Sequence, residues 1–235
     1  MLLGVTLAGC ATGPSANPSD PLEPLNRSVY KFNDALDSTV FKPVATTYRD
    51  VTPDLVRRGI GNFFGNIEDV WSFVNNVFQL KGAAAADTFF RVGVNTIMGL
   101  GGLLDVATEM RIERHPEDFG QTLGYWGVGA GPYLVLPVLG PSSLRDTAAL
   151  PADWRGDWVT QIEDIPTRNT LWVVRATDQR ANLLKAEGVL DQAALDKYSF
   201  IRDAYMQRRR NAVYDGEPPE EPAVDEAAPP QETTK

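Results

Sequence analysis

Residues 83–104 read AAAADTFFRVGVNTIMGLGGLL, and this stretch decides the fold class. Its polar side chains Asp87, Arg91 and Asn95 recur every four residues, which places them on one thin line of a helix. Nearly all of the remaining helix surface is apolar, so the helix must be buried in a protein core or in lipid. The glycines at the end of the stretch remove helix propensity and permit left-handed turns. We therefore expect a helical hairpin with an apolar, glycine-rich tip at residues 98–104.

A second amphipathic pattern covers residues 67–80. Its apolar side chains recur at the spacing of one helix face, and its polar side chains fall on the opposite face. The helix either packs on a protein core or turns its aromatic face to lipid. The candidate membrane-facing residues, from this pattern and from the stretch that follows it, are Trp71, Phe78, Phe89 and Phe90.

The rest of the chain is also dominated by helical patterns. We expect helices over residues 26–40, 167–188 and 193–213, with further helix starts at Thr52 and Pro53, where Thr caps and Pro opens the first turn. Residues 131–140 contain Pro137, which argues against a central strand and favours an extended segment against the helices. The predicted fold class is all-α, with little or no strand.

The N-terminus contains the one cysteine of the 235 residues, at the end of an apolar run in the sequence Leu7-Ala8-Gly9-Cys10. This arrangement resembles a bacterial lipobox, in which the cysteine is lipidated and the leader is removed. Residues 1–9 would then be a signal peptide. They lack a basic residue before the apolar run, which indicates a leader truncated by a misplaced start codon. The alternative is a frayed terminus that happens to contain a cysteine.

Composition separates the two ends of the chain from the folded part. Residues 10–22 are rich in Ser, Pro, Gly and Asn and form a flexible tether. Residues 215–235 carry −6 of the net charge of −9 and five prolines, so we expect a disordered tail. The domain at residues 23–214 is only mildly acidic, which argues against a nucleic-acid partner. No window reaches the roughly 20 apolar residues that span a bilayer as a helix.

No combination of residues indicates catalysis. The single histidine, His115, lies in a charged, proline-containing stretch that is typical of an exposed loop, although a Ser-His-Asp triad built on it stays open. One histidine and one cysteine do not make the usual zinc site. The glycine-rich runs lack the following Lys-Ser/Thr of a phosphate loop. We therefore expect neither an enzyme nor a cofactor or metal.

A series of motifs in fixed order covers residues 20–216. Taken together, these motifs resemble the VacJ (MlaA) family of lipoproteins of Gram-negative outer membranes. Asn26, Arg27, Asn62 and Phe63 belong to the family motifs and are expected to have structural roles. The motifs are DPLEPLNR (20–27), GNFFGN (61–66), FFR (89–91), GLGGLLDVA (99–107), DFGQTLG (118–124), GVG (127–129), GPY (131–133), LP (136–137), LRD (144–146), RDAY (202–205) and QRR (207–209).

The resemblance implies a ring-shaped helical body in the inner leaflet of the outer membrane, on the periplasmic side. It implies an amphipathic channel through which misplaced outer-leaflet phospholipid descends. The lipid would pass to a soluble periplasmic carrier protein and on to an inner-membrane ABC transporter system. Trimeric porins are the implied outer-membrane partners.

The motifs suggest roles within such a channel. Asp87, Arg91 and Asn95 would give the headgroup a polar path, or would be a buried ion pair that closes the helix bundle. The hairpin tip would flex as a gate. Two other functions stay open, a structural scaffold of an outer-membrane complex and a lipid hydrolase that uses His115. Trp154 and Trp158 lie in a segment that matches no family motif. The gate residues are Gly99, Gly101, Gly102, Leu103 and Leu104.

Overall fold

The computed structural model describes residues 20–193 and 195–220. The lipidation site Cys10, the signal peptide, most of the tether and the tail after residue 220 lie outside the described residues. The helices are α1 (Glu23–Leu36), α2 (Lys42–Val51), α3 (Asp54–Phe78), α4 (Gly82–Ile97), α5 (Val106–Glu109), α6 (Phe119–Tyr125), α7 (Leu144–Gly156), α8 (Ile165–Ala193) and α9 (Lys197–Val213). Two short strands, β1 (Tyr133–Leu136) and β2 (Gly140–Ser143), form a small sheet. Because the described residues are mostly helical, the predicted all-α class is confirmed.

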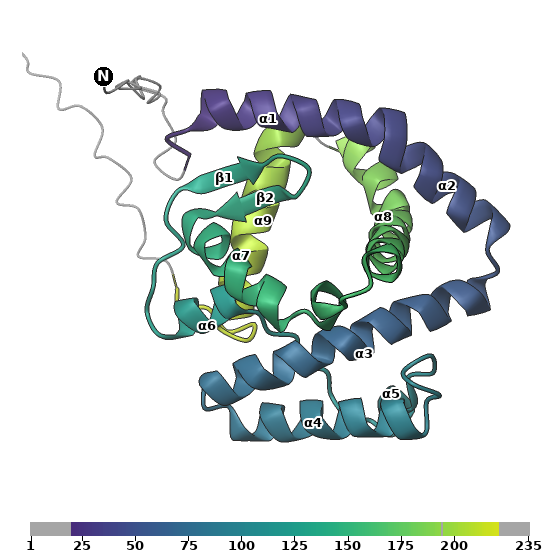
Figure 1. The fold of residues 1–235 in the computed structure, drawn as a ribbon. Helices are drawn as coiled ribbons and strands as arrows, with labels where there is room; N and C mark the ends of the chain where they lie inside the picture. The colour runs from purple at the N-terminus through teal and green to yellow at the C-terminus, as the bar shows by residue number, and fades with distance from the viewer. Residues whose placement is uncertain (1–19, 194, 221–235) are drawn as a thin grey trace, which may run out of the picture.

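The helices form a ring (Figure 1). A π-helical turn, Asp37–Phe41, joins α1 to α2, and the two helices make one continuous arc above the ring's interior. The helix α3 crosses below, α8 lies on the right, and α7, α9 and the two strands lie on the left. Below α3, α4 packs along it on the side away from the interior. The ring-shaped body that the family resemblance implies is therefore present.

The segment at residues 131–140 differs from its prediction. It forms an antiparallel hairpin in which Tyr133 faces Ser143 and Leu136 faces Gly140. Pro137 lies in the turn and Pro141 lies in β2. Because the sheet has two strands, each strand is an edge strand, where a missing backbone N–H is tolerated.

The helical hairpin also lies elsewhere than predicted. The antiparallel pair is α3 and α4, and it turns at residues 79–81, where Leu80 adopts a φ of 60°. The glycine-rich segment after α4 leads only into the single turn of α5. At the start of α3 the residue before the helix is Pro53, and no side chain caps it, so the predicted Thr52 cap is wrong.

A buried polar network fixes α1 to the strands and to α9. The Asn26 side chain, 1% exposed, donates to the Tyr133 carbonyl at 3.0 Å and accepts from the Val135 N–H at 2.9 Å. It also donates to the carboxylate of Asp20 at 2.8 Å, which accepts from the Tyr198 hydroxyl at 2.5 Å. A buried amide must have its hydrogen bonds made, and here two bonds join α1 to β1 while the third reaches Asp20, which is bonded to Tyr198 of α9.

Candidate functional site

The polar face of α3 points into the protein and its apolar face points out. Four side chains of the polar face, Ser72, Asn75, Asn76 and Gln79, are at most 4% exposed. On the other face, Phe78 is 49% exposed. This arrangement is the reverse of that of a helix packed on an apolar core in water.

The buried polar face binds the segment that precedes and begins α6. Gln79 Nε2 donates to the Glu117 carboxylate at 2.9 Å and to the Thr122 hydroxyl at 3.1 Å. The Thr122 hydroxyl donates in turn to Asn75 Oδ1 at 2.8 Å. Ser72 donates to the Glu117 carbonyl at 3.2 Å. Hydrogen bonds therefore join the C-terminal part of α3 to α6 and to the segment before it.

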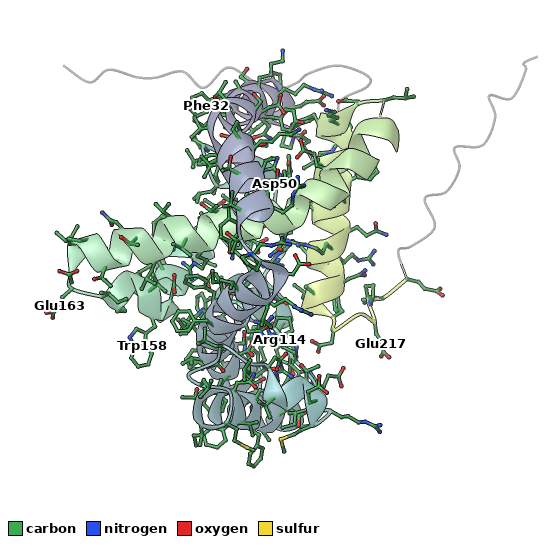
Figure 2. All side chains as sticks on the ribbon, turned by 90° about the vertical axis from the view of Figure 1, so that its right-hand side faces the viewer. Phe32, Asp50, Arg114, Trp158, Glu163 and Glu217 are labelled. Carbon is green, nitrogen blue, oxygen red and sulfur yellow. The ribbon has the colours of Figure 1, made fainter. Side chains whose placement is uncertain are left out.

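The apolar residues predicted to face a membrane are mostly on the outer surface. Phe89 and Phe90 on α4 are each 59% exposed, and their rings contact one another. Figure 2 shows Phe32 on α1 and Trp158 after α7 pointing away from the body. Soluble monomers rarely expose apolar side chains over so wide a surface. No helix in the described part of the chain is long and apolar enough to cross a bilayer.

Trp71 is the exception among the predicted membrane-facing residues. Its indole N–H donates to Asp153 Oδ1 at 2.8 Å, so the side chain turns inward toward α7. Gly156 lies against the indole ring so closely that a Cβ there would overlap it. The structure therefore places Trp71 in the wall of a cavity, while the lipid contacts of the other three residues stay a prediction.

The polar side chains predicted to lie along one line of α4 make hydrogen bonds to other parts of the protein. Arg91, 3% exposed, donates to both Asp105 carboxylate oxygens at 3.0 and 3.2 Å and to the Ile112 carbonyl at 2.6 Å. Asn95 donates to Asp105 Oδ1 at 3.1 Å and accepts from a backbone N–H. Asp87, near the surface, lies 3.2 Å from His115 Nε2. These bonds fit the buried ion pair left open by the sequence, and the polar path stays a prediction.

The glycine-rich segment folds back against α3 on the far side from the β-hairpin (Figure 1). The Leu103 carbonyl accepts from Asn62 Nδ2 at 3.1 Å. Gly99 has backbone carbonyls so close that it has no room for a side chain. Leu103 and Leu104 line a groove of about 810 Å³ against α3. The gate remains a hypothesis, and the structure places the segment away from the ring's interior.

Glycine substitutions at this segment should have graded effects on stability. At Gly102 φ is +94° and a Cβ would lie 2.8 Å from Asn66 Cβ, so Gly102→Ala should lower the free energy of unfolding by about 2–3 kcal/mol. Gly101 has a φ of +74° but open space, so its alanine variant should lose about 1 kcal/mol. Gly93 lies inside α4 with open space, and Gly93→Ala should be neutral or stabilising. Chemical unfolding in detergent measures the series, and an identical stability for all three variants would contradict the observed backbone.

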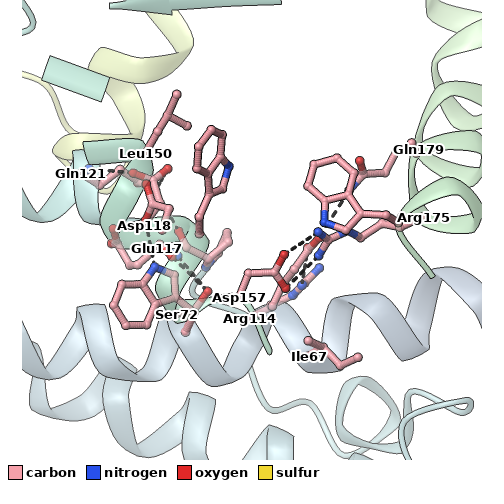
Figure 3. Close-up of a pocket in the computed structure, with 17 residues that line it drawn as sticks. Ile67, Ser72, Arg114, Glu117, Asp118, Gln121, Leu150, Asp157, Arg175 and Gln179 are labelled. Carbon is pink, nitrogen blue, oxygen red and sulfur yellow. Dashed lines mark hydrogen bonds and ion pairs between the residues drawn. The ribbon is translucent and has the colours of Figure 1, made fainter. Parts of the chain in front are cut away.

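A cavity of about 410 Å³ opens on the ring's interior (Figure 3). The helix α3 forms its floor, with Ile67 and Ser72. Gln121 of α6 and Leu150 of α7 lie on one side, and residues of α8 lie on the other. Its aromatic and charged lining consists of Glu68, Trp71, Arg114, Glu117, Asp118, Asp153, Trp154, Asp157, Trp172 and Arg175.

The cavity contains charges of both signs. Arg175 on α8 pairs with Asp157 through two hydrogen bonds of 2.5 and 3.1 Å. Burial raises the pKa of Glu68 and of Asp153, and neighbouring hydrogen bonds and cations offset it only in part. The site can thus hold a ligand with a polar, charged end.

His115 is the residue on which the hydrolase alternative depends. The His115 imidazole contacts the Asp87 carboxylate, and no serine hydroxyl in the described part of the chain is hydrogen-bonded to it. Within residues 20–193 and 195–220, no group of three or more His, Cys, Asp or Glu side chains is arranged to hold a metal ion.

The family model for MlaA lipoproteins matches residues 18–212. The chain belongs to the MlaA lipoprotein family. The intermembrane phospholipid transport system lipoprotein MlaA of Escherichia coli (strain K12) is 38% identical over 227 residues, which cover 92% of this chain and 88% of that protein. The protein of the same name from Haemophilus influenzae is 33% identical over 231 residues, covering 92% and 89%.

A solved structure of this family has the same fold. It is described as "Structural basis for maintenance of bacterial outer membrane lipid asymmetry" and is 37% identical, with a TM-score of 0.73. The match covers 83% of this chain and 99% of that chain. The family match and the solved structure therefore both confirm the helical fold that the resemblance implies.

The MlaA motif residues contact neighbouring parts of the fold. Arg27 on α1 donates to the Asp196 carboxylate at 2.6 and 3.3 Å, and its guanidinium lies 4.3 Å from the centre of the Tyr198 ring. Phe63 on α3 packs edge-on against Phe64. Together with Asn26 and Asn62, these contacts fit the structural roles that the MlaA resemblance implies.

Sequence reasoning missed most of the cavity in this MlaA fold. Trp154 matches no family motif, and no pattern marks Trp172 or Arg175, yet all three line the cavity. Their signal in the sequence is weak because they come from two helices and face each other only after folding. The concentration of tryptophan among charged residues at 153–164 is the one clue that the sequence offers.

Proposed function

We propose that this chain is an outer-membrane lipoprotein of a phospholipid-transport system, which maintains lipid asymmetry. Its ring-shaped domain at residues 23–214 provides a channel that moves misplaced outer-leaflet phospholipid to a periplasmic carrier. The names of the relatives from Escherichia coli and Haemophilus influenzae support the transport system. The subject of the solved structure, outer-membrane lipid asymmetry, supports the compartment.

The observation that carries this proposal is the reversed polarity of the ring. Polar side chains of α3 are buried inside, while Phe78, Phe89 and Phe90 are exposed outside. Lipid tails around the ring would solvate the apolar surface, and a polar interior would accept a headgroup. A scaffold in water needs neither feature, because an exposed apolar surface promotes association.

The proposed partners follow from the same arrangement. The exposed apolar surface would contact the outer membrane and a trimeric porin. A soluble periplasmic carrier protein of an ABC transporter system would receive the lipid from the periplasmic side. The diacylglycerol on Cys10 would hold the protein on that side of the outer membrane.

Deletion and complementation test the transport function. A strain that lacks the protein should expose more phosphatidylethanolamine on its surface, measured with an amine reagent that does not cross the membrane. Wild-type protein and the exposed-site variant Arg208→Ala should restore the low level. An unchanged surface in the deletion strain would favour a scaffold. If Gly101 and Gly102 form a gate, the double alanine variant should fail to restore asymmetry at normal protein levels.

The hydrolase alternative has a direct test. Purified protein incubated with labelled phospholipid should leave the ester bonds intact, because the described residues place no nucleophile at His115. Release of labelled fatty acid, lost in His115→Ala, would overturn the transport proposal in favour of an enzyme.

Removal of the lipid anchor should separate targeting from membrane affinity. Cys10→Ala should be absent from the outer-membrane fraction but should still bind detergent micelles, because the exposed apolar surface remains. Fractionation and light scattering with and without detergent measure the two properties. A Cys10→Ala protein that is a monomer without detergent and binds no micelles would contradict a membrane-embedded body.

A further inference from the structure

The charges in the cavity above α3 do not cancel. Five charged side chains of the lining have close partners of opposite sign, in or beside the cavity. Two carboxylates, Glu68 and Asp153, have no cation within 3.5 Å among the described residues, since Arg114 is 3.8 Å from Glu68. The close pairs are Arg175 with Asp157, Arg114 with Asp69, Glu117 with Lys81, and Asp118 with Arg209.

Asp153 keeps one oxygen open. Its Oδ1 accepts both from the Trp71 indole N–H and from the Phe119 backbone N–H, each at 2.8 Å. Its Oδ2 has no hydrogen bond within the described part of the chain, and this oxygen is not fully buried. Glu68 Oε1 accepts one long bond of 3.3 Å from Gln179, and its side chain is 44% exposed. The two carboxylates thus retain acceptor capacity for a ligand that donates.

The rest of the wall suits a cation. Trp71, Trp154 and Trp172 line the same cavity as the two carboxylates. Tryptophan is the side chain whose ring face attracts a cation most strongly, within about 6 Å of the ring centre. The Arg175 guanidinium already lies 5.3 Å from the centre of the Trp172 ring. Arg114, 41% exposed, supplies a positive charge beside Glu68.

We propose that this cavity binds the ethanolamine end of a phospholipid headgroup, with the ammonium against Glu68, Asp153 and the tryptophan rings and the phosphate toward Arg114. This inference rests on the transport function proposed above and names the lipid class that the ring prefers. An ammonium donates three N–H groups, which matches the open carboxylate oxygens better than the methylated nitrogen of choline. An anionic glycerol headgroup would bring a negative charge to a cavity in which Asp153 has no close cation and Glu68 has only Arg114, at 3.8 Å.

Two physical arguments support the assignment. The volume of about 410 Å³ lies within the range of about 300–1,000 Å³ typical of small-molecule sites and accommodates a headgroup. Burial raises the pKa of Glu68 and of Asp153, so a nearby positive charge would favour their charged forms. A bound ammonium would compensate both charges.

The test is lipid binding to the full-length lipoprotein purified in detergent. Phosphatidylethanolamine, phosphatidylcholine and phosphatidylglycerol with identical labelled acyl chains serve as probes in mixed micelles. Wild-type protein should bind phosphatidylethanolamine about tenfold more tightly than phosphatidylglycerol, with phosphatidylcholine in between. Glu68→Gln and Asp153→Asn should each remove most of this preference. Glu163→Gln and Asp50→Asn, which change exposed carboxylates on the outer surface (Figure 2), should keep it.

The outcomes separate the two proposals. If no lipid binds, the transport function itself is overturned. If all three lipids bind equally to wild-type protein, or the preference survives in both cavity variants, only the headgroup site is overturned. Glu68→Gln keeps the test decisive even if Asp153→Asn fails to fold, because Glu68 is half-exposed. Free phosphoethanolamine should compete weakly, and competition equal to that of the lipid would assign the site to a soluble ligand and overturn the inference.

Discussion

Arg209→Ala should lower the free energy of unfolding by about 3–5 kcal/mol, because it removes the shared partner of two carboxylates. Arg209 on α9 donates to Asp118 at 2.6 and 2.9 Å and to Asp146 at 2.9 Å through two nitrogens. Its side chain is 12% exposed and that of Asp146 is 10% exposed. Without the guanidinium, Asp118 would lose its cation and Asp146 would keep only Arg145, at the place where α6, α7 and α9 meet.

The neighbouring residue supplies the control. Arg208 lies on the exposed side of the same helix, so Arg208→Ala should change the stability by less than about 0.5 kcal/mol. Chemical unfolding in detergent at pH 7 measures both variants. An Arg209→Ala protein as stable as Arg208→Ala would contradict the stabilising role of Arg209 as the shared partner of Asp118 and Asp146.

The ion pair between Arg209 and Asp146 also predicts that the stability of the protein depends on pH. Burial by itself raises the pKa of Asp146, but hydrogen bonds and charge from Arg209 outweigh it and lower the pKa to about 2. Since the pKa is lower in the folded state, this carboxylate stabilises the fold above pH 4, and the contribution is lost as the pH falls toward 2. The stability difference between wild-type protein and Arg209→Ala should therefore shrink on acidification. A difference that stays constant from pH 7 to pH 3 would contradict this prediction.

Arg91→Ala should lower the free energy of unfolding by a similar amount, about 3–5 kcal/mol, because it removes the cation that joins α4 to Asp105. Arg91 connects α4 to Asp105 and to the carbonyl of Ile112, and its Nε lies 3.7 Å from the buried Asp69. Burial alone would raise the pKa of Asp105, but hydrogen bonds from Thr108 and Asn95 and the charge of Arg91 lower it. The carboxylate is thus ionised in the fold and needs its cation.

This variant also decides between the two roles that the sequence left open for Arg91. If Arg91 serves packing, Arg91→Ala should be destabilised. If Arg91 belongs to a lipid path, Arg91→Ala should be stable but should fail to maintain lipid asymmetry. Arg91→Lys, which keeps the charge but not the paired donors, should recover part of the stability. The exposed Arg58→Ala is the control. Wild-type stability in Arg91→Ala with lost asymmetry would favour the lipid path.

The sequence predicts the helices well and their orientation poorly. Periodicity locates the helix over residues 67–80 and the long helices near the C-terminus, and the structure confirms α3, α8 and α9. Periodicity does not say which face is inside, because that depends on whether water or lipid surrounds the helix. Asn75 and Asn76 are therefore on the buried face, and Phe78 is on the exposed one.

The cavity depends on tertiary structure and so escapes the sequence. Trp71 has the spacing of an apolar stripe, yet a hydrogen bond to Asp153, 82 residues away, turns it inward. Likewise Pro137 reads as a strand breaker until the turn it occupies pairs β1 with β2. Family motifs locate the structural anchors such as Asn26, whereas most residues of the cavity lie outside the motifs, with Asp118 and Gln121 of DFGQTLG as exceptions.

Photo-crosslinking from inside the ring tests most directly whether lipid occupies the interior. A photoreactive amino acid at Gln179, which lines the cavity from α8, should form adducts with phospholipid in living cells. The same photoreactive amino acid in place of Arg208, on the exposed side of α9, should form far fewer adducts. Mass spectrometry of the adducts identifies the lipid. Phospholipid attached at position 179 supports passage through the ring, and equal labelling at both positions, or none at 179, would contradict it.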